Sequence, residues 1–221
     1  MTSFSRFPRR GSDSFRDGKW GSRDQGWSAD NLLSLWWAYG NADDLKEAER
    51  HLADFEAVET RVYGGKGYVI NEAMNPPSMK PWMHDIVLNA AARHAWLTGS
   101  ERFHPLMNRM QDFLLRHALL PAKPGQPRMV KRNLHPGTGH VDGASHHLLW
   151  PMAASYALCW LATGDDADRD LAAALFENAI LFHQGKAGAP LSFRMTAYPG
   201  SESKVLSNVG LWGLPAQVAL P

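Results

Sequence analysis

The strongest constraint in this sequence is an internal repeat of a helix, a glycine turn and a second helix. Each first helix ends with a tryptophan close to a glycine, and the three glycines, Gly40, Gly99 and Gly164, lie 59 and 65 residues apart. Polar residues that favour a helix start follow each glycine, and glycine is the preferred residue just after a helix end. Because near-regular self-similarity is typical of repeat architectures, the sequence predicts stacked helical hairpins.

The two helices of each predicted hairpin differ in the pattern of their apolar residues. In the second helices, apolar residues recur with a period of about 3.6 residues, which predicts one buried face per helix. These faces comprise Ala48, Leu52 and Phe55, then Met107, Met110 and Leu114, then Ala172, Leu175 and Ala179. The first helices, such as residues 83–97 and 148–161, are apolar over most of their circumference. We therefore expect the first helices to form an inner layer and the second helices an outer layer.

The expected fold class is all-α, with about seven helices in repeated inner and outer hairpins, the last at residues 205–220. Alternation typical of a strand is confined to residues 68–70. Residues 1–25 are predicted to form a polar N-terminal arm, and residues 26–221 the helical domain. The tryptophans of the repeat turns are predicted to lie in the core: Trp36, Trp37, Trp96 and Trp160.

Composition narrows the class of protein. The chain has 221 residues, a net charge of +1, 44% hydrophobic and 20% charged residues, which is typical of one globular domain. Without a continuous basic stripe, no nucleic-acid partner is expected, and the single cysteine, Cys159, excludes internal disulfides. No apolar run is long enough to span a membrane, and the N-terminus lacks the apolar core of a secretion signal. We expect no membrane partner, and a cytoplasmic location if Met1 is the true start.

The connections between the predicted helices are asymmetric in length. Turns from an inner to an outer helix take a few residues, whereas the return connections, at residues 58–80, 120–144 and 185–204, are long. Connections of more than about 12–15 residues are often functional. In a ring of antiparallel hairpins the long connections emerge at the same end, so we expect one end of the domain to carry the functional site.

This pattern resembles the α/α toroid shared by many polysaccharide lyases and glycoside hydrolases, rhamnogalacturonan-lyase-like toroid proteins among them. The resemblance covers about residues 20–220 and rests on the repeat and on turns in which tryptophan precedes threonine, glycine and a polar residue, at residues 96–100 and 160–165. It implies a carbohydrate substrate. Seven helices are too few for a complete ring, so a missing domain or self-association is expected to close the toroid.

The densest group of polar candidates precedes the third inner helix, where four histidines fall within residues 135–147. His140 or His146 would serve as a general acid or base, because imidazole titrates near neutral pH. His135 is a predicted substrate-binding residue, and Asp142 a predicted catalytic residue whose alternative role is to cap the helix. These side chains are competent metal ligands, but their spacing matches no zinc signature; we expect neither a metal nor a cofactor.

The second inner helix begins after a proline-rich segment and carries polar residues in its first turns. His84 and Asp85 are predicted catalytic residues, and Trp82 and Asn89 predicted binding residues on the same helix. Adjacent helical residues point about 100° apart, so Asp85 is not expected to orient His84 directly. The alternative roles are structural: a favourable charge at the helix start for Asp85, and a buried hydrogen-bonded side chain for His84.

Two further segments carry candidates on the expected site end. Indoles cover apolar sugar faces and arginine binds carboxylates through paired hydrogen bonds. The candidates before the first inner helix are Trp20, Arg23, Asp24 and Trp27, with a helix-entry contact as the alternative for Trp27. In the last long connection, Arg194 is a candidate carboxylate clamp and Tyr198 a candidate proton donor, or both are solvated loop residues.

Three functions remain open from the sequence. The histidine-rich, arginine-bearing connections favour lyase-type β-elimination on a uronate-containing glycan, with histidine or tyrosine removing the proton. A glycoside hydrolase needs two carboxylates, about 5–9.5 Å apart, for which Asp24, Asp85, Asp142 and Glu202 are candidates. The third possibility is a glycan-binding or scaffold fragment of a longer toroid protein without turnover.

Overall fold

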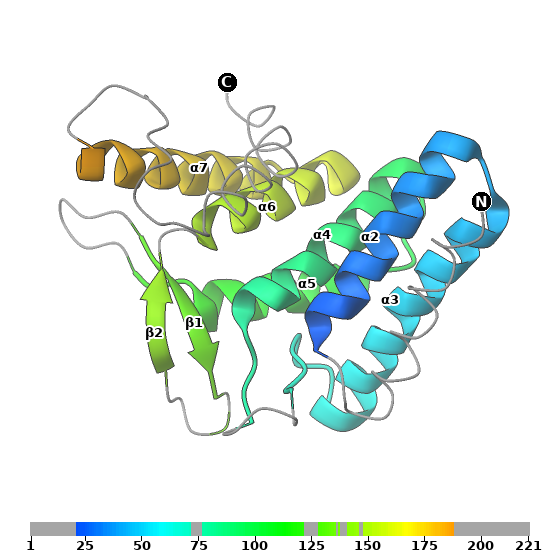
Figure 1. The fold of residues 1–221 in the computed structure, drawn as a ribbon, viewed down its shortest axis with the longest axis horizontal. Coiled ribbons are helices and arrows are strands. Elements are labelled where there is room, and N and C mark those ends of the chain that lie inside the picture. The colour runs from blue at the N-terminus through cyan, green and yellow to red at the C-terminus, as the bar shows by residue number, and fades with distance from the viewer. Residues whose placement is uncertain are drawn as a thin grey trace.

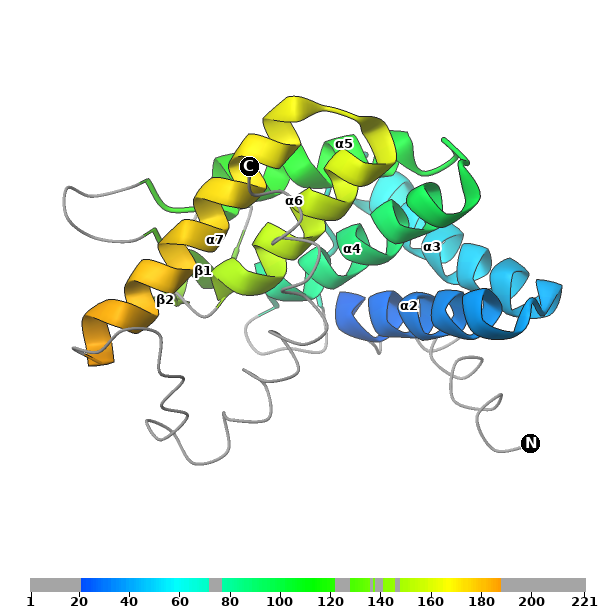
Figure 2. The same cartoon turned by 90° about the horizontal axis from the view of Figure 1, so that it is seen from above.

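The computed structural model describes residues 21–71, 77–121, 128–135, 137, 141–145 and 148–187. Three helical hairpins succeed one another, α2 with α3, α4 with α5, and α6 with α7, and α4 packs between α2 and α6 (Figures 1 and 2). The inner helices are α2 (Ser22–Tyr39), α4 (Pro81–Thr98) and α6 (Leu149–Thr163). The outer helices are α3 (Ala42–Tyr63), α5 (His104–Phe113), which continues as the π-helical turn η1 (Leu114–Ala118), and α7 (Asp166–Ala187).

The repeat turns have the conformation that their glycines predict. Gly40, Gly99 and Gly164 adopt left-handed φ angles of 70°, 67° and 74°, which glycine reaches without steric cost. Each glycine N–H donates to a carbonyl in the last turn of the preceding helix. The three inner-to-outer turns are thus built alike, as the repeat predicts.

Burial confirms the assignment of inner and outer layers. All nine apolar residues predicted to face inward from the outer helices are at most 1% exposed. Most residues of α4 and α6 are also buried, and the small side chains of Ala90, Ala91 and Ala92 allow α4 to pack closely among its neighbours. The mostly helical architecture predicted from the sequence is confirmed.

The repeat-turn tryptophans correct one prediction. Trp37 is 71% exposed and Trp96 is 49% exposed, and Trp36 and Trp160 are only partly buried, so none of the four belongs to the core. The short turns place these indoles at the end of the bundle where the inner helices finish, and of the four only Trp160 packs against the main cluster of buried residues that the structure describes. These tryptophans recur because the turn sequence repeats, and their recurrence does not indicate that they are buried.

The second long connection contains a β-hairpin. Strand β1 (Val130–Leu134) pairs antiparallel with β2 (Val141–Ser145), with Val130 opposite Ser145 and Leu134 opposite Val141. Met79, just before α4, exchanges two backbone hydrogen bonds of 3.0 and 2.9 Å with Leu134. The first and second long connections therefore meet at the end of the domain where α4 begins, as expected.

Several predicted boundaries move. Helix α3 continues six residues into the connection predicted at residues 58–80, and α7 includes residues 185–187 of the predicted third connection. The rest of that connection and the predicted helix at residues 205–220 lie outside the described residues. Helix α2 begins at Ser22, within the predicted arm of residues 1–25. No helix in the described ranges is long and apolar enough to cross a bilayer.

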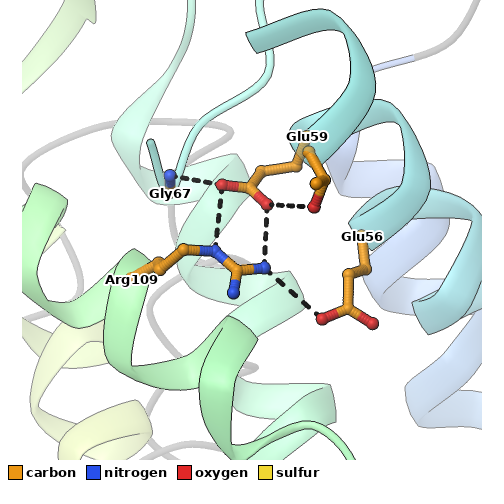
Figure 3. A network of polar contacts seen from close by, with 5 residues as sticks. Glu56, Glu59, Gly67 and Arg109 are labelled. Carbon is orange, nitrogen blue, oxygen red and sulfur yellow. Dashed lines mark hydrogen bonds and ion pairs between the residues drawn. The ribbon is translucent and has the colours of Figure 1, made fainter. Parts of the chain in front are cut away.

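The first long connection is held in place by the buried carboxylate of Glu59 on α3 (Figure 3). Glu59 is 0% exposed; one of its oxygens accepts a 2.6 Å hydrogen bond from the N–H of Gly67, and the other accepts 2.9 Å from Nη2 of Arg109 on α5. Gly67 has φ +77°, and a Cβ atom there would lie 2.1 Å from the carbonyl oxygen of Arg109. Only glycine fits this approach, so the connection closes tightly over α5.

Replacing Glu59 by alanine is expected to lower the free energy of unfolding by about 3–5 kcal/mol, because the Gly67 N–H loses its acceptor and Arg109 loses its buried carboxylate partner. Glu56, which also contacts Arg109 but is 28% exposed, provides the matched control. Glu56→Gln is expected to cost about 1 kcal/mol or less. Urea unfolding followed by circular dichroism measures both. Equal losses in the two variants would contradict the assignment.

Candidate functional site

The candidate site lies at the end of the domain where the inner helices begin, which we call the rim. The rim comprises the first turns of α2 and α4 together with the first connection, residues 64–71. Gly26 brings α2 against α4: a Cβ atom at Gly26 would lie 2.7 Å from Cγ2 of Ile86 and 2.8 Å from the backbone nitrogen of Val87. This close approach places the first-turn side chains of α2 beside those of α4.

His84 joins three parts of the rim. Its Nδ1 lies 3.2 Å from the carbonyl oxygen of Lys80, so this nitrogen carries the proton and donates. Its Nε2 accepts hydrogen bonds from the N–H of Val69 at 2.8 Å and from the hydroxyl of Ser22 at 3.2 Å. A histidine on α4 therefore holds both the first connection and the start of α2.

The surroundings of His84 favour the neutral imidazole. The side chain is 1% exposed and meets the ring of Phe55 edge-on at 5.7 Å. Burial lowers the pKa of His84 to about 4, although the hydrogen bonds to Lys80 and Val69 act in the opposite direction. Both ring nitrogens are engaged in structural contacts, which favours the structural alternative for His84 over proton transfer to a substrate.

Asp85, the next residue, is a buried carboxyl group. It is 2% exposed, and burial raises its pKa to about 7, with the Ser155 hydroxyl acting in the opposite direction. That hydroxyl lies within hydrogen-bond distance of the backbone carbonyls of Asp85, at 3.2 Å, and Pro151, at 3.1 Å. Neither carboxyl oxygen of Asp85 has a hydrogen-bond partner within the described part of the chain. The neutral acid is therefore the stable form below about pH 7.

His84 and Asp85 make opposite contributions to the pH dependence of stability. The pKa of His84 is about 4 in the fold against an ordinary 6.5, so the unfolded chain binds more protons and stability rises with pH in this window. The pKa of Asp85 is about 7 against an ordinary 3.8, so the folded chain binds more protons and stability falls as pH rises. In wild type the two slopes largely cancel between pH 4 and 6.5.

We expect Asp85→Asn and His84→Gln to expose these slopes separately. Between pH 4.5 and 6.5, each would change the slope of unfolding free energy against pH by up to about 1.4 kcal/mol per unit relative to wild type. The slope becomes more positive for Asp85→Asn and more negative for His84→Gln. Urea titrations at a series of pH values measure this, and variant curves that run parallel to wild type would contradict both assignments.

Four predicted binding residues form a cluster at the rim, near the starts of α2 and α4. The guanidinium carbon of Arg23 lies 5.0 Å from the ring centroid of Trp27 and 5.9 Å from that of Trp82. Trp27 is 42% exposed and Trp82 is partly buried. Asp24 lies beside Arg23, with 3.9 Å between Oδ1 and Nε, and burial raises its pKa. We call these four residues the Arg23 cluster.

The remaining predicted site residues are not brought together by the described structure. Asn89 is 4% exposed within α4, His135 is partly buried just after β1, and the backbone of Asp142 pairs with Asn133 in the hairpin. The others lie outside the described residues: His140, His146, Tyr198, Trp20 and Arg194. Among the residues that the structure does describe, no three histidine, cysteine, aspartate or glutamate side chains gather as a metal site would require.

Sequence reasoning missed the residues that support the rim. Glu59, Gly67 and Arg109 fix the path of the first connection, yet Glu59 and Arg109 are 50 residues apart in sequence and belong to different hairpins. No periodicity or motif marks such a pair. A polar hollow elsewhere, lined by residues of α3 and by Arg102 before α5, lies away from the rim and contains none of the predicted site residues.

Comparisons with known proteins identify the fold. No protein-family model and no curated protein matches the chain. A solved GH76 alpha-mannanase from Bacteroides thetaiotaomicron has a similar structure, with a TM-score of 0.61 and 17% sequence identity. The match covers 75% of this chain and 44% of that chain, so this chain spans less than half of the mannanase. The described hairpins are a partial α/α toroid. The likeness does not single out the lyase-like toroid proteins.

Proposed function

We propose that this chain is a carbohydrate-active protein of the glycoside hydrolase type that binds its glycan at the rim. The observation that carries the proposal is that Trp27 and Trp82, which belong to two neighbouring inner helices, both lie beside the guanidinium of Arg23. Indole faces are large, rigid and apolar, with a polar N–H at the edge, and so match the mixed surface of a sugar ring. The fold supports the proposal, because a mannanase has a similar structure.

Two features favour hydrolysis over β-elimination. The solved structure of similar fold belongs to a glycoside hydrolase. Of the carboxylates predicted for hydrolysis, Asp24 lies in the first turn of α2 and Asp85 in the second turn of α4. Burial raises the pKa of each, as a general acid requires. Asp24 is the more accessible, and we assign it the role of proton donor. Of the bases predicted for β-elimination, His84 is buried in structural contacts, and His140, His146 and Tyr198 lie outside the described residues. That function stays a prediction from the sequence.

Oligosaccharide affinities test whether the indoles of Trp27 and Trp82 contact the glycan. Trp27→Ala and Trp82→Ala are each expected to weaken binding of a soluble α-mannan oligosaccharide about ten-fold, as losing about 1.4 kcal/mol of apolar contact implies. Trp37→Ala and Trp96→Ala are the controls, because these exposed indoles lie at the other end of the inner helices. Isothermal titration calorimetry gives the affinities. If only the control variants bind the oligosaccharide more weakly, the binding site lies at the opposite end of the inner helices, and the proposal is wrong.

Product analysis separates the reactions. Incubation with a panel of neutral and uronate-containing polysaccharides is expected to release reducing ends without the ultraviolet absorbance of unsaturated sugars. Asp24→Asn is expected to lower the rate by about 100-fold or more, the usual contribution of a general acid. Unsaturated products would establish elimination instead. Binding without any product would favour the glycan-binding fragment, for which the 44% span of the mannanase is the supporting observation.

A further inference from the structure

Arg23 occupies a position that helix electrostatics disfavours. It lies in the first turn of α2, where the partial positive charge of a helix N-terminus repels a cation. Other interactions must therefore hold it there. Its guanidinium lies over two indoles, 5.0 Å from the Trp27 centroid and 5.9 Å from the Trp82 centroid, and contacts with ring faces attract a cation.

The hydrogen-bond donors of Arg23 are unused within the described chain. Nε is buried and donates no hydrogen bond to a described residue. The nearest carboxylate oxygen, Oδ1 of Asp24, is 3.9 Å from Nε, which is beyond hydrogen-bond distance. The side chain is still 39% exposed, so solvent reaches the guanidinium.

Two other arginines that connect helices in the same bundle behave differently. Arg93 of α4 donates to Asp30 of α2 at 2.8 Å, and Arg109 donates to Glu59 at 2.9 Å. Each has a carboxylate in direct contact, as is usual for a partly buried guanidinium. Arg23 is positioned by rings instead, and no carboxylate among the described residues accepts a hydrogen bond from it, which leaves its donors for a carboxylate or other oxyanion of a ligand.

We infer that Arg23 selects glycans that carry an anionic group. The inference rests on the proposed function and names its substrate class. A sugar ring stacks on the exposed Trp27 while its oxyanion accepts paired hydrogen bonds from the guanidinium. A uronate carboxylate and a phosphate or sulfate ester all fit the planar fork. In its ionised form Asp24 opposes such a ligand, because a second negative charge close to the guanidinium weakens the attraction.

The test uses the whole chain and pairs of trisaccharides that differ only in charge. One arm compares uronate trimers, of galacturonate, mannuronate and glucuronate, with their carboxyl-reduced neutral counterparts. Another arm compares phosphorylated and sulfated trimers with the same neutral sugars, and inorganic phosphate alone forms a third. Isothermal titration calorimetry at low ionic strength gives each affinity, and the salt dependence is measured for any pair that binds.

Wild type is expected to bind at least one anionic trimer about ten-fold more tightly than its neutral counterpart, in line with a charge-assisted pair of hydrogen bonds. Arg23→Gln removes this preference and Arg23→Lys retains part of it, because lysine keeps the charge but loses the fork. Asp24→Asn strengthens the preference. Arg102→Gln is the matched control, because Arg102 also lies over a ring, at 4.9 Å from Phe103, but away from the rim.

Four outcomes overturn the inference. Equal affinity for charged and neutral trimers in wild type would refute anion selection while leaving the proposed function intact, whereas no binding of any trimer would count against both. A preference that survives Arg23→Gln, in protein whose circular dichroism and melting temperature match wild type, would place the anion elsewhere. Tight binding of inorganic phosphate without any preference among trimers would identify a free-anion site and not a glycan site.

Discussion

The buried carboxylate of Glu59 is the constraint on which the rim depends. A carboxylate with no exposed surface is costly unless its oxygens accept hydrogen bonds, and here Gly67 and Arg109 supply them. This requirement fixes where the first connection leaves α3 and how closely it passes α5. Two residues later, the N–H of Val69 reaches His84. A path of polar contacts thus runs from the outer helices to the first turns of α4 and α2.

The rim contains two kinds of side chain, buried ones that support the backbone and exposed ones that can contact a ligand. His84 and Asp85 lie below the surface, where burial favours the neutral form of each. In the Arg23 cluster, by contrast, the charged side chain of Arg23 and the indole of Trp27 are partly exposed to solvent. Buried neutral side chains that fix the backbone, together with exposed charged and aromatic side chains, suit a site that binds a polar ligand with little rearrangement. The division also explains why neighbouring helix positions have such different chemistry.

The layers of the fold could be predicted from the sequence because they depend on local spacing. Leu52, Met110 and Leu175 occupy matching positions in three helices whose apolar residues recur at helical intervals, and all three are buried as that pattern requires. The recurring tryptophans misled the same reasoning. Trp37 has the large apolar side chain of a core residue, but it lies at the end of α2 and is 71% exposed. Periodicity indicates a face of a helix and cannot tell how far the neighbouring layer extends.

The site was only partly predictable, because its geometry depends on contacts distant in sequence. Arg23, Trp27 and Trp82 were recognised by residue type, and packing of α2 on α4 brings them together. The structural contacts of His84 could not be predicted, since its partners are a backbone N–H 15 residues away and a hydroxyl 62 residues away. Glu59 and Arg109 meet only after two hairpins have packed.

Hydrogen exchange at the first connection tests the central claim most directly. Site-resolved exchange of the Gly67 and Val69 amides reports whether the Glu59 carboxylate and the His84 imidazole hold this segment against the helices. The account predicts protection close to that of amides in the interior of α4, such as Leu88. Exchange of both amides at the rate of an unstructured peptide, while Leu88 stays protected, would contradict it.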